Sequence, residues 1–283
     1  MQKLWLYEDR ECESRFMESF KSNPVNLFSL THKMFIDSSL DSNFIWLLFN
    51  YEFKKPNVEV DIIGGKCKSD ISNQCPCIQP LLDYIIAIEV KCSRYNCKEE
   101  NGLKAKQEDD DQEKIQKQLY YRLQMGFDKV SLLDILFTNP GTDDGLRAWF
   151  NASDKINNAH KIMKNNKVFE GRLNNESLES VGQYFFGKGS VRDDINEFLS
   201  GSGEAVVKKQ SKLNPFLKGK DVINNRKRIE ETFNRIDIAG NFHFPFNFSS
   251  FKLYDEKCKA LYMQVLPIQL KNGTILYLFL NRL

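Results

Sequence analysis

The stretch Val58-Glu59-Val60-Asp61-Ile62-Ile63-Gly64-Gly65 and, after a polar loop, the stretch Asp83-Tyr84-Ile85-Ile86-Ala87-Ile88-Glu89-Val90-Lys91 decide how this chain folds. The second stretch is almost unbroken apolar sequence from Tyr84 to Val90, which is typical of a central strand covered on both faces. The first stretch predicts a shorter apolar strand that ends in two glycines. We expect the two strands to pair as neighbours at the centre of a sheet.

Charged side chains interrupt both apolar strands. Glu89 and Lys91 are two residues apart, so on a strand both side chains leave the sheet on the same face. An unpaired charge in a buried strand costs several kcal/mol, so the pair should lie at an open cleft or neutralise another group there. Asp61, on the neighbouring strand, is the group that we expect to share this cleft.

These residue types favour hydrolysis of a phosphate ester with the help of a metal ion. Mg²⁺ usually takes one or two protein carboxylates, here Asp61 and Glu89, and completes its coordination with waters and substrate phosphate. Mn²⁺ accepts the same oxygen ligands. A lysine beside them, here Lys91, can orient or deprotonate the attacking water and offset the charge of the phosphate.

The order of these residues resembles the PD-(D/E)xK nuclease superfamily, in which an Asp on one strand is followed by Glu-x-Lys on the next. The matching residues are Asp61 and then Glu89-Val90-Lys91. Many members then carry a helix with Gln-x-x-x-Tyr, and Gln116-Lys117-Gln118-Leu119-Tyr120 is similar to it. The stretch Ser42-Asn43-Phe44-Ile45-Trp46-Leu47-Leu48 resembles a helix of one bacterial branch. The resemblance covers roughly residues 37–140 and implies a restriction-endonuclease-like fold with nuclease activity.

One acidic residue of the superfamily pattern has no obvious match. Members usually present it, most often as Glu, from a helix before the first strand, and this sequence has Asp37 and Asp41 near that place. The resemblance makes Asp41 the catalytic candidate; the alternative is that Asp41 caps a densely apolar helix expected from about residue 41 to residue 50. A further helix expected over residues 4–20 carries other acids, each either a ligand or part of a solvated face: Glu11, Glu13 and Glu18.

The glutamine of the resemblance lies on a helix that the sequence predicts from Gln112 to about Met125, with Gly126 as its C-terminal stop. Gln116 and Tyr120 are four residues apart and share a line beside the apolar stripe, which suits a polar pair over the rim of the cleft. The alternative is a glutamine that only bonds to backbone. The apolar stripe comprises Ile115, Leu119 and Leu123.

Two polar segments flank the proposed strands and helix. Residues 101–112 read as a solvated loop, in which Asp110 or Asp111 caps the following helix. Residues 64–82 read as a loop rich in cysteine. Tetrahedral zinc sites use thiolates, but the absence of paired Cys-x-x-Cys spacings and of a nearby histidine favours free thiols. The cysteines concerned are Cys67, Cys75, Cys77, Cys92 and Cys97.

Composition bounds the class of protein. The 40 basic and 38 acidic residues give a formal net charge of +2, which excludes a strongly basic, histone-like binder but not a local phosphate-binding patch. No apolar run approaches the length of a membrane span, and the acidic N-terminal residues do not form a signal peptide. We therefore expect a soluble cytoplasmic protein with no membrane partner, whose 7 cysteines are reduced.

The remaining elements complete the predicted architecture. Residues 130–137 form another core strand, so residues 1–140 give a mixed α/β sheet flanked by helices. Residues 141–283 form a C-terminal α+β extension that packs on this core and could bind substrate. Its expected elements are helices over 146–163 and 176–199, a flexible joint at 200–203, a basic segment over 208–228, and a hairpin of 261–270 with 274–280.

The sequence thus predicts a Mg²⁺- or Mn²⁺-dependent nuclease. DNA is the favoured substrate because the superfamily mostly cuts DNA, and defence, restriction and repair are all compatible roles. The main alternative is the same fold as a catalytically inactive module that binds nucleic acid or protein. A zinc-stabilised interaction protein is a second alternative. The oligomeric state stays open, with a homodimer among the options.

Overall fold

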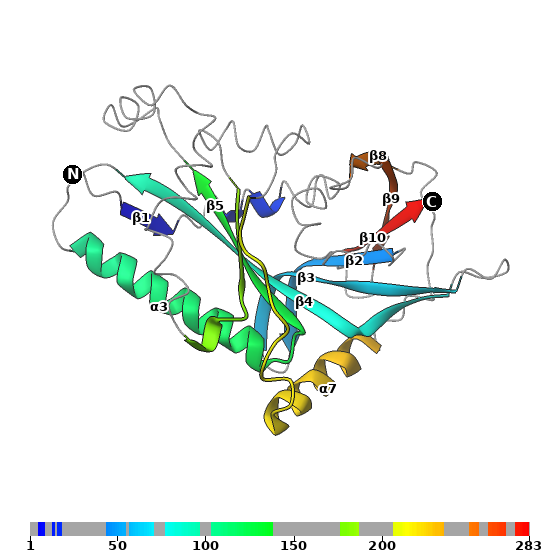
Figure 1. The fold of residues 1–283 in the computed structure, drawn as a ribbon, viewed down its shortest axis with the longest axis horizontal. Helices are drawn as coiled ribbons and strands as arrows, with labels where there is room; N and C mark the ends of the chain where they lie inside the picture. The colour runs from blue at the N-terminus through cyan, green and yellow to red at the C-terminus, as the bar shows by residue number, and fades with distance from the viewer. Residues whose placement is uncertain are drawn as a thin grey trace.

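The computed structural model describes residues 5–8, 13–14, 16–18, 44–54, 57–70, 77–96, 103–137, 176–186, 206–234, 249–254, 260–269 and 275–282. Its described strands form one mixed sheet with the order β7-β6-β5-β4-β3-β2-β10-β9-β8, and β1 pairs with the far end of β4. Pairs β4–β5 and β5–β6 are parallel, and the other pairs are antiparallel. The long helix α3 runs beside the sheet (Figure 1). The expectation of a mixed α/β sheet is confirmed.

The element bounds follow the chain from blue to red in Figure 1. The first half comprises β1 Trp5–Glu8, β2 Phe44–Lys54, β3 Asn57–Asp70, β4 Cys77–Asn96, α3 Leu103–Gln124 and β5 Lys129–Phe137. The second half comprises the 3₁₀ helix η3 Glu176–Leu178, β6 Gly182–Phe186, β7 Val206–Lys209, α7 Lys220–Asn234, β8 Ser249–Tyr254, β9 Ala260–Gln269 and β10 Ile275–Arg282.

The two central strands pair as predicted. β3 and β4 are antiparallel neighbours, with Ile62 across from Ile88 and Ile63 across from Ala87. All four of these side chains are fully buried. A strand that is apolar on both faces needs cover on both, and α3 covers one of them with its apolar stripe. That stripe is the predicted one, Ile115, Leu119 and Leu123.

The expected helix over residues 41–50 is wrong, because Phe44–Lys54 forms strand β2. The run Phe44 to Phe49 is apolar at every position, which suits a buried strand as well as a buried helix. Its aromatic and β-branched residues favour the strand, and β3 and β10 pair with it on either side. The helix of the bacterial branch is therefore not formed by this stretch, and Asp37 and Asp41 lie outside the described residues. Residues 51–54 form the second half of β2.

The prediction of a cysteine-rich loop over residues 64–82 is also largely wrong. β3 continues to Asp70 and β4 already begins at Cys77, so most of residues 64–82 are a long hairpin with a register shift between Gly65 and Cys67. Polar sequence can form such strands because each pairs with the other along the hairpin. Cys67, Cys77 and Cys92 lie in strands, and the other cysteines of the proposed zinc site, Cys75 and Cys97, lie outside the described residues.

Helix α3 is longer than predicted and ends where predicted. It begins at Leu103, so the acidic run lies inside the helix and neither Asp110 nor Asp111 is its cap. The residues before the acidic run, Leu103-Lys104-Ala105-Lys106-Gln107, are good helix formers and start the helix ahead of it. At the other end Gly126 adopts a φ of 91° and donates its N–H to the Leu123 carbonyl at 3.1 Å, which confirms the predicted stop.

The remaining strands fall into two groups. The sequence analysis missed β1 and β6, and it predicted β5 and the β9–β10 hairpin correctly. Trp5–Glu8 is strand β1 rather than helix; residues 13–14 and 16–18 are helical. The expected helix over 176–199 is wrong where it is described, since Gly182–Phe186 extends the sheet as β6. The strand over 130–137 and the β9–β10 hairpin are confirmed. β6 and β10 join opposite sides of the first-half strands, so both halves of the chain build one sheet. The helix over 146–163 and the joint at 200–203 lie outside the described residues.

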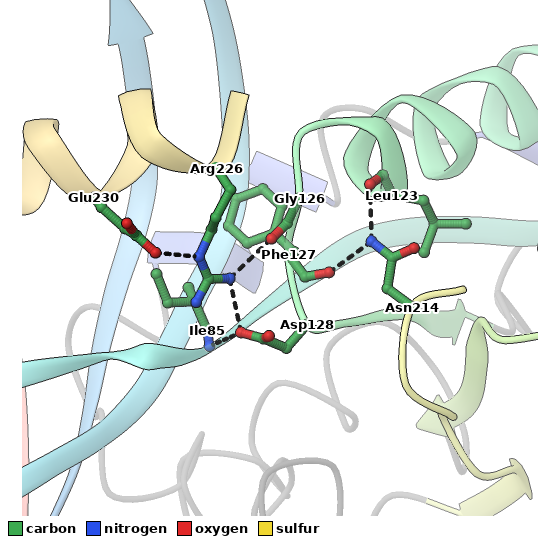
Figure 2. Close-up of polar contacts among 8 residues, drawn as sticks. All are labelled: Ile85, Leu123, Gly126, Phe127, Asp128, Asn214, Arg226 and Glu230. Atoms are coloured by element: carbon green, nitrogen blue, oxygen red, sulfur yellow. Dashed lines mark hydrogen bonds and ion pairs between the residues drawn. The ribbon is translucent and has the colours of Figure 1, made fainter. Parts of the chain in front are cut away.

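A buried polar cluster ties the segment 206–234 to the turn between α3 and β5 (Figure 2). Arg226 donates from Nη1 to Asp128 Oδ2 at 2.7 Å and to the Gly126 carbonyl at 2.8 Å. Asn214 donates to the carbonyls of Leu123 and Phe127, each at 2.8 Å. We call this group the Asp128 cluster; it comprises Ile85, Leu123, Gly126, Phe127, Asp128, Asn214, Arg226 and Glu230.

Within the described residues, no helix is long and apolar enough to cross a membrane.

Candidate functional site

Strand alternation places the three predicted site residues on the face that α3 covers. Ala87 on β4 and Ile63 on β3 pack in the core with the α3 stripe. Side chains two residues away on the same strand share a face, so Glu89 and Asp61 also lie on the face that α3 covers. The pairing of Ile62 with Ile88 puts Asp61 directly across from Glu89. Like charges directly opposite each other destabilise a sheet, so this arrangement needs compensation from neighbouring cations.

Glu89 is the centre of the site and is 1% exposed. Its Oε1 lies 3.1 Å from Lys91 Nζ. Its Oε2 accepts from Arg122, at 3.2 Å from Nε and at 3.0 Å from Nη2. Each carboxylate oxygen therefore contacts a different cation. We call the group the Glu89 cluster; it comprises Glu13, Asp61, Glu89, Lys91 and Arg122.

Arg122 is a site residue that the sequence analysis missed. It comes from α3, is 5% exposed, and also donates from Nη2 to the Glu59 carbonyl at 2.6 Å. The sequence carries a signal for it. Position 122 is seven residues after Ile115 and belongs to the buried stripe of the helix, where an arginine is unusual. A buried arginine on a core stripe requires an acidic partner, and Glu89 supplies one.

The N-terminal helical residues bring a third acid to the cluster. Glu13 Oε2 lies 3.9 Å from Lys91 Nζ, and the Glu13 side chain is mostly buried. Of the three N-terminal glutamates proposed from the sequence, Glu18 is exposed and Glu11 lies outside the described residues. Glu13 is thus the acid that reaches the site from before the first central strand. Asp41, the other candidate, lies outside the described residues.

Asp61 combines burial with a backbone contact. Its Oδ2 accepts from the Val90 N–H at 2.7 Å. Burial, with the Glu89 and Glu13 charges, raises the pKa of Asp61 to about 8, although Lys91 and the Val90 N–H act in the opposite direction. In the absence of a bound cation, Asp61 therefore keeps its proton at neutral pH.

The backbone next to Asp61 is strained. Asn50 on β2 has a φ of 45°, in the left-handed region that only a few per cent of non-glycine residues adopt. It lies between the pairs Phe49–Ile62 and Tyr51–Val60, directly opposite Asp61. Asparagine tolerates this conformation better than other residues. Such strain gathers at functional sites, so its position opposite Asp61 agrees with a functional role for the residues around Asp61.

A second acid lies on the same face of the sheet. Asp134 on β5 is across from Lys91 in the parallel β4–β5 register and is 1% exposed. Gln183 on β6, also buried, donates from Nε2 to Asp134 Oδ2 at 3.3 Å. The sequence analysis missed Asp134, although it interrupts the apolar strand Leu132-Leu133-Asp134-Ile135-Leu136 just as Asp61 interrupts its own.

The two residues of the Gln-x-x-x-Tyr pair have different surroundings on α3. Tyr120 is 41% exposed, and its ring packs edge-on against Phe216 with centroids 5.7 Å apart. It therefore contacts the 206–234 segment. Gln116 is half-buried on α3, and its expected role at the rim of the cleft stays a prediction.

The ligands present fit a hard divalent cation. Asp61 and Glu89 offer carboxylate oxygens from adjacent strands, and Mg²⁺ needs only one or two such ligands when water and phosphate complete its coordination. Among the residues that the structure describes, no group of three or more His, Cys, Asp or Glu side chains is arranged to hold a metal ion. The geometry thus supports a site with two carboxylates and not a complete protein-derived coordination shell.

Comparisons with known proteins add no relative. No protein family, no curated protein and no solved structure matches the chain significantly. The structure establishes a mixed α/β sheet with a cluster of buried charged side chains on one face. The function must therefore be argued from the chemistry of the Glu89 cluster.

Proposed function

We propose that this protein is a metal-dependent nuclease that hydrolyses phosphodiester bonds, most readily in DNA, on a restriction-endonuclease-like core. The observation that carries the proposal is the meeting of Asp61, Glu89 and Lys91 on one face of two adjacent strands. Two acids and an ammonium group have little structural justification among the apolar residues that flank them on the two strands. Their order along the chain is the one that the superfamily resemblance implies.

Each residue of the cluster has a role in the proposed reaction. Asp61 and Glu89 would hold Mg²⁺ or Mn²⁺, which supplies charge stabilisation at the phosphate and a lower pKa for a bound water. Lys91 orients the attacking water and offsets the charge that develops on the phosphate. Arg122 holds Glu89 Oε2 and fixes the orientation of the carboxylate.

Glu13 takes the part of the N-terminal acid in this proposal, ahead of Asp41. It comes from helical residues before the first central strand, as the superfamily pattern implies, and it lies within 3.9 Å of Lys91 Nζ. Glu13→Gln should therefore lower cleavage more strongly than Asp41→Asn. The reverse order would restore Asp41 to the role that the sequence resemblance gives it.

The basic segment 208–228 lends only limited support to DNA binding. Arg226 is occupied in the Asp128 cluster, and Lys212 pairs with Glu179 at 2.8 Å. Lys209 donates to the Leu178 carbonyl at 3.4 Å. The exposed cations there that could follow a phosphate backbone include Lys218, Lys220 and Lys227. DNA as the substrate therefore follows mainly from the superfamily resemblance.

A cleavage assay tests the proposal. The purified protein is incubated with plasmid DNA, single-stranded DNA and RNA, each with Mg²⁺, Mn²⁺ or EDTA. We expect cleavage of DNA with either metal and none with EDTA. Asp61→Asn should abolish it, whereas Glu113→Gln, which alters an exposed ion pair on α3, should not. Metal-independent cleavage, or full activity of Asp61→Asn, would remove the cleft from the mechanism.

A second candidate function is a catalytically inactive module that binds nucleic acid or protein. It is favoured by the contacts of Glu89, whose two oxygens both lie against cations, as in a purely structural ion network. In that case the same assay shows retention of DNA in a gel without cleavage under any metal condition.

A further inference from the structure

Lys91 lies where a bound cation would compete with it. Its Nζ is 3.1 Å from Glu89 Oε1 and 3.9 Å from Glu13 Oε2, and the lysine side chain is almost fully buried. An ammonium group between two carboxylates satisfies the same electrostatic demand as a small metal ion. The proposed reaction, however, needs this ammonium group near water and phosphate.

The two oxygens of Glu89 are held with unequal rigidity. Oε2 is held by Arg122, whose planar guanidinium is also anchored to the Glu59 carbonyl at 2.6 Å. Oε1 faces Lys91, a point charge on a flexible four-carbon stem. Of the two oxygens, Oε1 is thus the one whose cation can be exchanged without displacing the helix.

We propose that Lys91 acts as an internal counter-ion that occupies the cation position beside Glu89 Oε1, and that a divalent metal ion displaces it and releases its ammonium group towards the substrate. The inference rests on the proposed function, because it concerns the same metal position. Arg122 stays in place during the exchange and keeps Glu89 oriented. Metal binding and the availability of the lysine are then coupled.

Metal titration by calorimetry tests the exchange, with Mn²⁺ and Mg²⁺ as the probes. Lys91→Met keeps an unbranched side chain that is one atom shorter and removes the competing charge, so we expect at least tenfold tighter Mn²⁺ binding. Arg122→Met removes an equal charge from the same carboxylate, but it also removes the anchor, so it should bind Mn²⁺ more weakly than the wild type. Lys129→Met is the matched control, because Lys129 is a buried lysine on β5 that lies over the Tyr84 ring. Its affinity should equal that of the wild type.

Chemical labelling of the wild-type protein gives a second readout that needs no variant. An amine-acylating reagent is applied with and without Mn²⁺, and the modification of each lysine is measured by mass spectrometry. Lys91 should react faster with Mn²⁺ present, while Lys129 reacts at an unchanged rate. Equal tightening in Lys91→Met and Arg122→Met, or labelling of Lys91 that does not respond to metal, overturns the exchange.

The outcomes separate this inference from the proposed function. If the wild type binds Mn²⁺ and cleaves DNA but Lys91→Met binds no tighter, only the exchange is wrong. If the wild type binds neither Mn²⁺ nor Mg²⁺, the metal site and the exchange are both wrong. If Lys91→Met fails to fold, as judged by circular dichroism, the labelling experiment on the wild type decides.

Discussion

Two clusters of buried charged side chains are built differently: the Glu89 cluster lies between α3 and the sheet, and the Asp128 cluster lies at the turn between α3 and β5. In the Asp128 cluster the charged groups contact backbone: Asp128 accepts from the Ile85 N–H at 2.6 Å, and Arg226 donates to the Gly126 carbonyl. In the Glu89 cluster both oxygens of the central carboxylate contact side chains, Lys91 and Arg122, while Asp61 and Arg122 also contact backbone. A charge fixed by backbone holds segments together. A charge held by mobile side chains can exchange partners, which a reaction requires.

Catalysis should show the largest difference between the clusters. Glu89→Gln should lower DNA cleavage by about 10³-fold or more, because it weakens the metal site and the contact with Lys91. Asp128→Asn should retain cleavage per folded molecule within a fewfold. Initial rates on plasmid DNA, normalised to folded protein, measure both. Similar losses in the two variants would contradict the division of roles.

The free energy of unfolding should depend strongly on the Asp128 cluster, in contrast to catalysis. Arg226→Met leaves Asp128 buried beside an apolar side chain, so we expect a loss of about 3 kcal/mol in the free energy of unfolding. Urea denaturation measures it. The control is Lys227→Met on the exposed side of α7, which should change the free energy of unfolding by less than about 0.5 kcal/mol. A similar small change in Arg226→Met would mean that the cluster contributes little to the fold.

The stability of the metal-free protein should depend on pH through Asp61. Its pKa is raised to about 8 in the folded state, so the folded protein holds a proton that the unfolded chain loses near pH 4. The contribution to stability is complete below about pH 4 and is lost as the pH rises through about 8. We expect a decline on the order of 1 kcal/mol for each pH unit between those two values, measured by urea denaturation in EDTA. Asp61→Asn should flatten this part of the profile, and an unchanged slope in that variant would assign it to another group.

The smallest effect concerns the turn that supports the Asp128 cluster. Gly126 has a φ of 91°, and an added Cβ would lie 2.9 Å from Arg226 Cβ. Gly126→Ala should therefore cost about 1–2 kcal/mol of unfolding free energy. Gly219→Ala is the comparison, because its Cβ would meet the Phe216 carbonyl at 3.2 Å without a positive φ. Thermal melts of the two variants should rank them in that order.

Local patterns predicted the parts of the fold that local physics decides. The apolar run 84–90 identified the central strand, and the stripe beginning at Ile115 identified the buried face of α3. Gly126 marked the helix end because few other residues adopt that backbone conformation. For the run at Phe44 the same reasoning failed, because a sequence that is apolar at every position has no period to separate helix from strand.

The sequence analysis identified only some residues of the candidate site, because local patterns reveal some of these positions and not others. Asp61, Glu89 and Lys91 are visible because each interrupts an apolar strand. Arg122 and Asp134 give the same kind of signal, and a systematic search for charges at buried positions finds them. Glu13 gives no such signal: its place beside Lys91 depends on the path of residues far apart in sequence. Spacing alone could not choose it over the neighbouring glutamates.

The sheet order has a consequence for how the protein is made. β10 pairs with β2, with Leu276 across from Leu48, so a strand from late in the sequence lies between β2 and β9 in the interior of the sheet. During synthesis the hydrogen-bonding edge of β2 stays open until β10 leaves the ribosome. An open apolar edge is a template for pairing with other chains. A chain that stops before Ile275 should consequently accumulate in inclusion bodies, and chaperones that shield nascent strands should raise the yield of the intact protein.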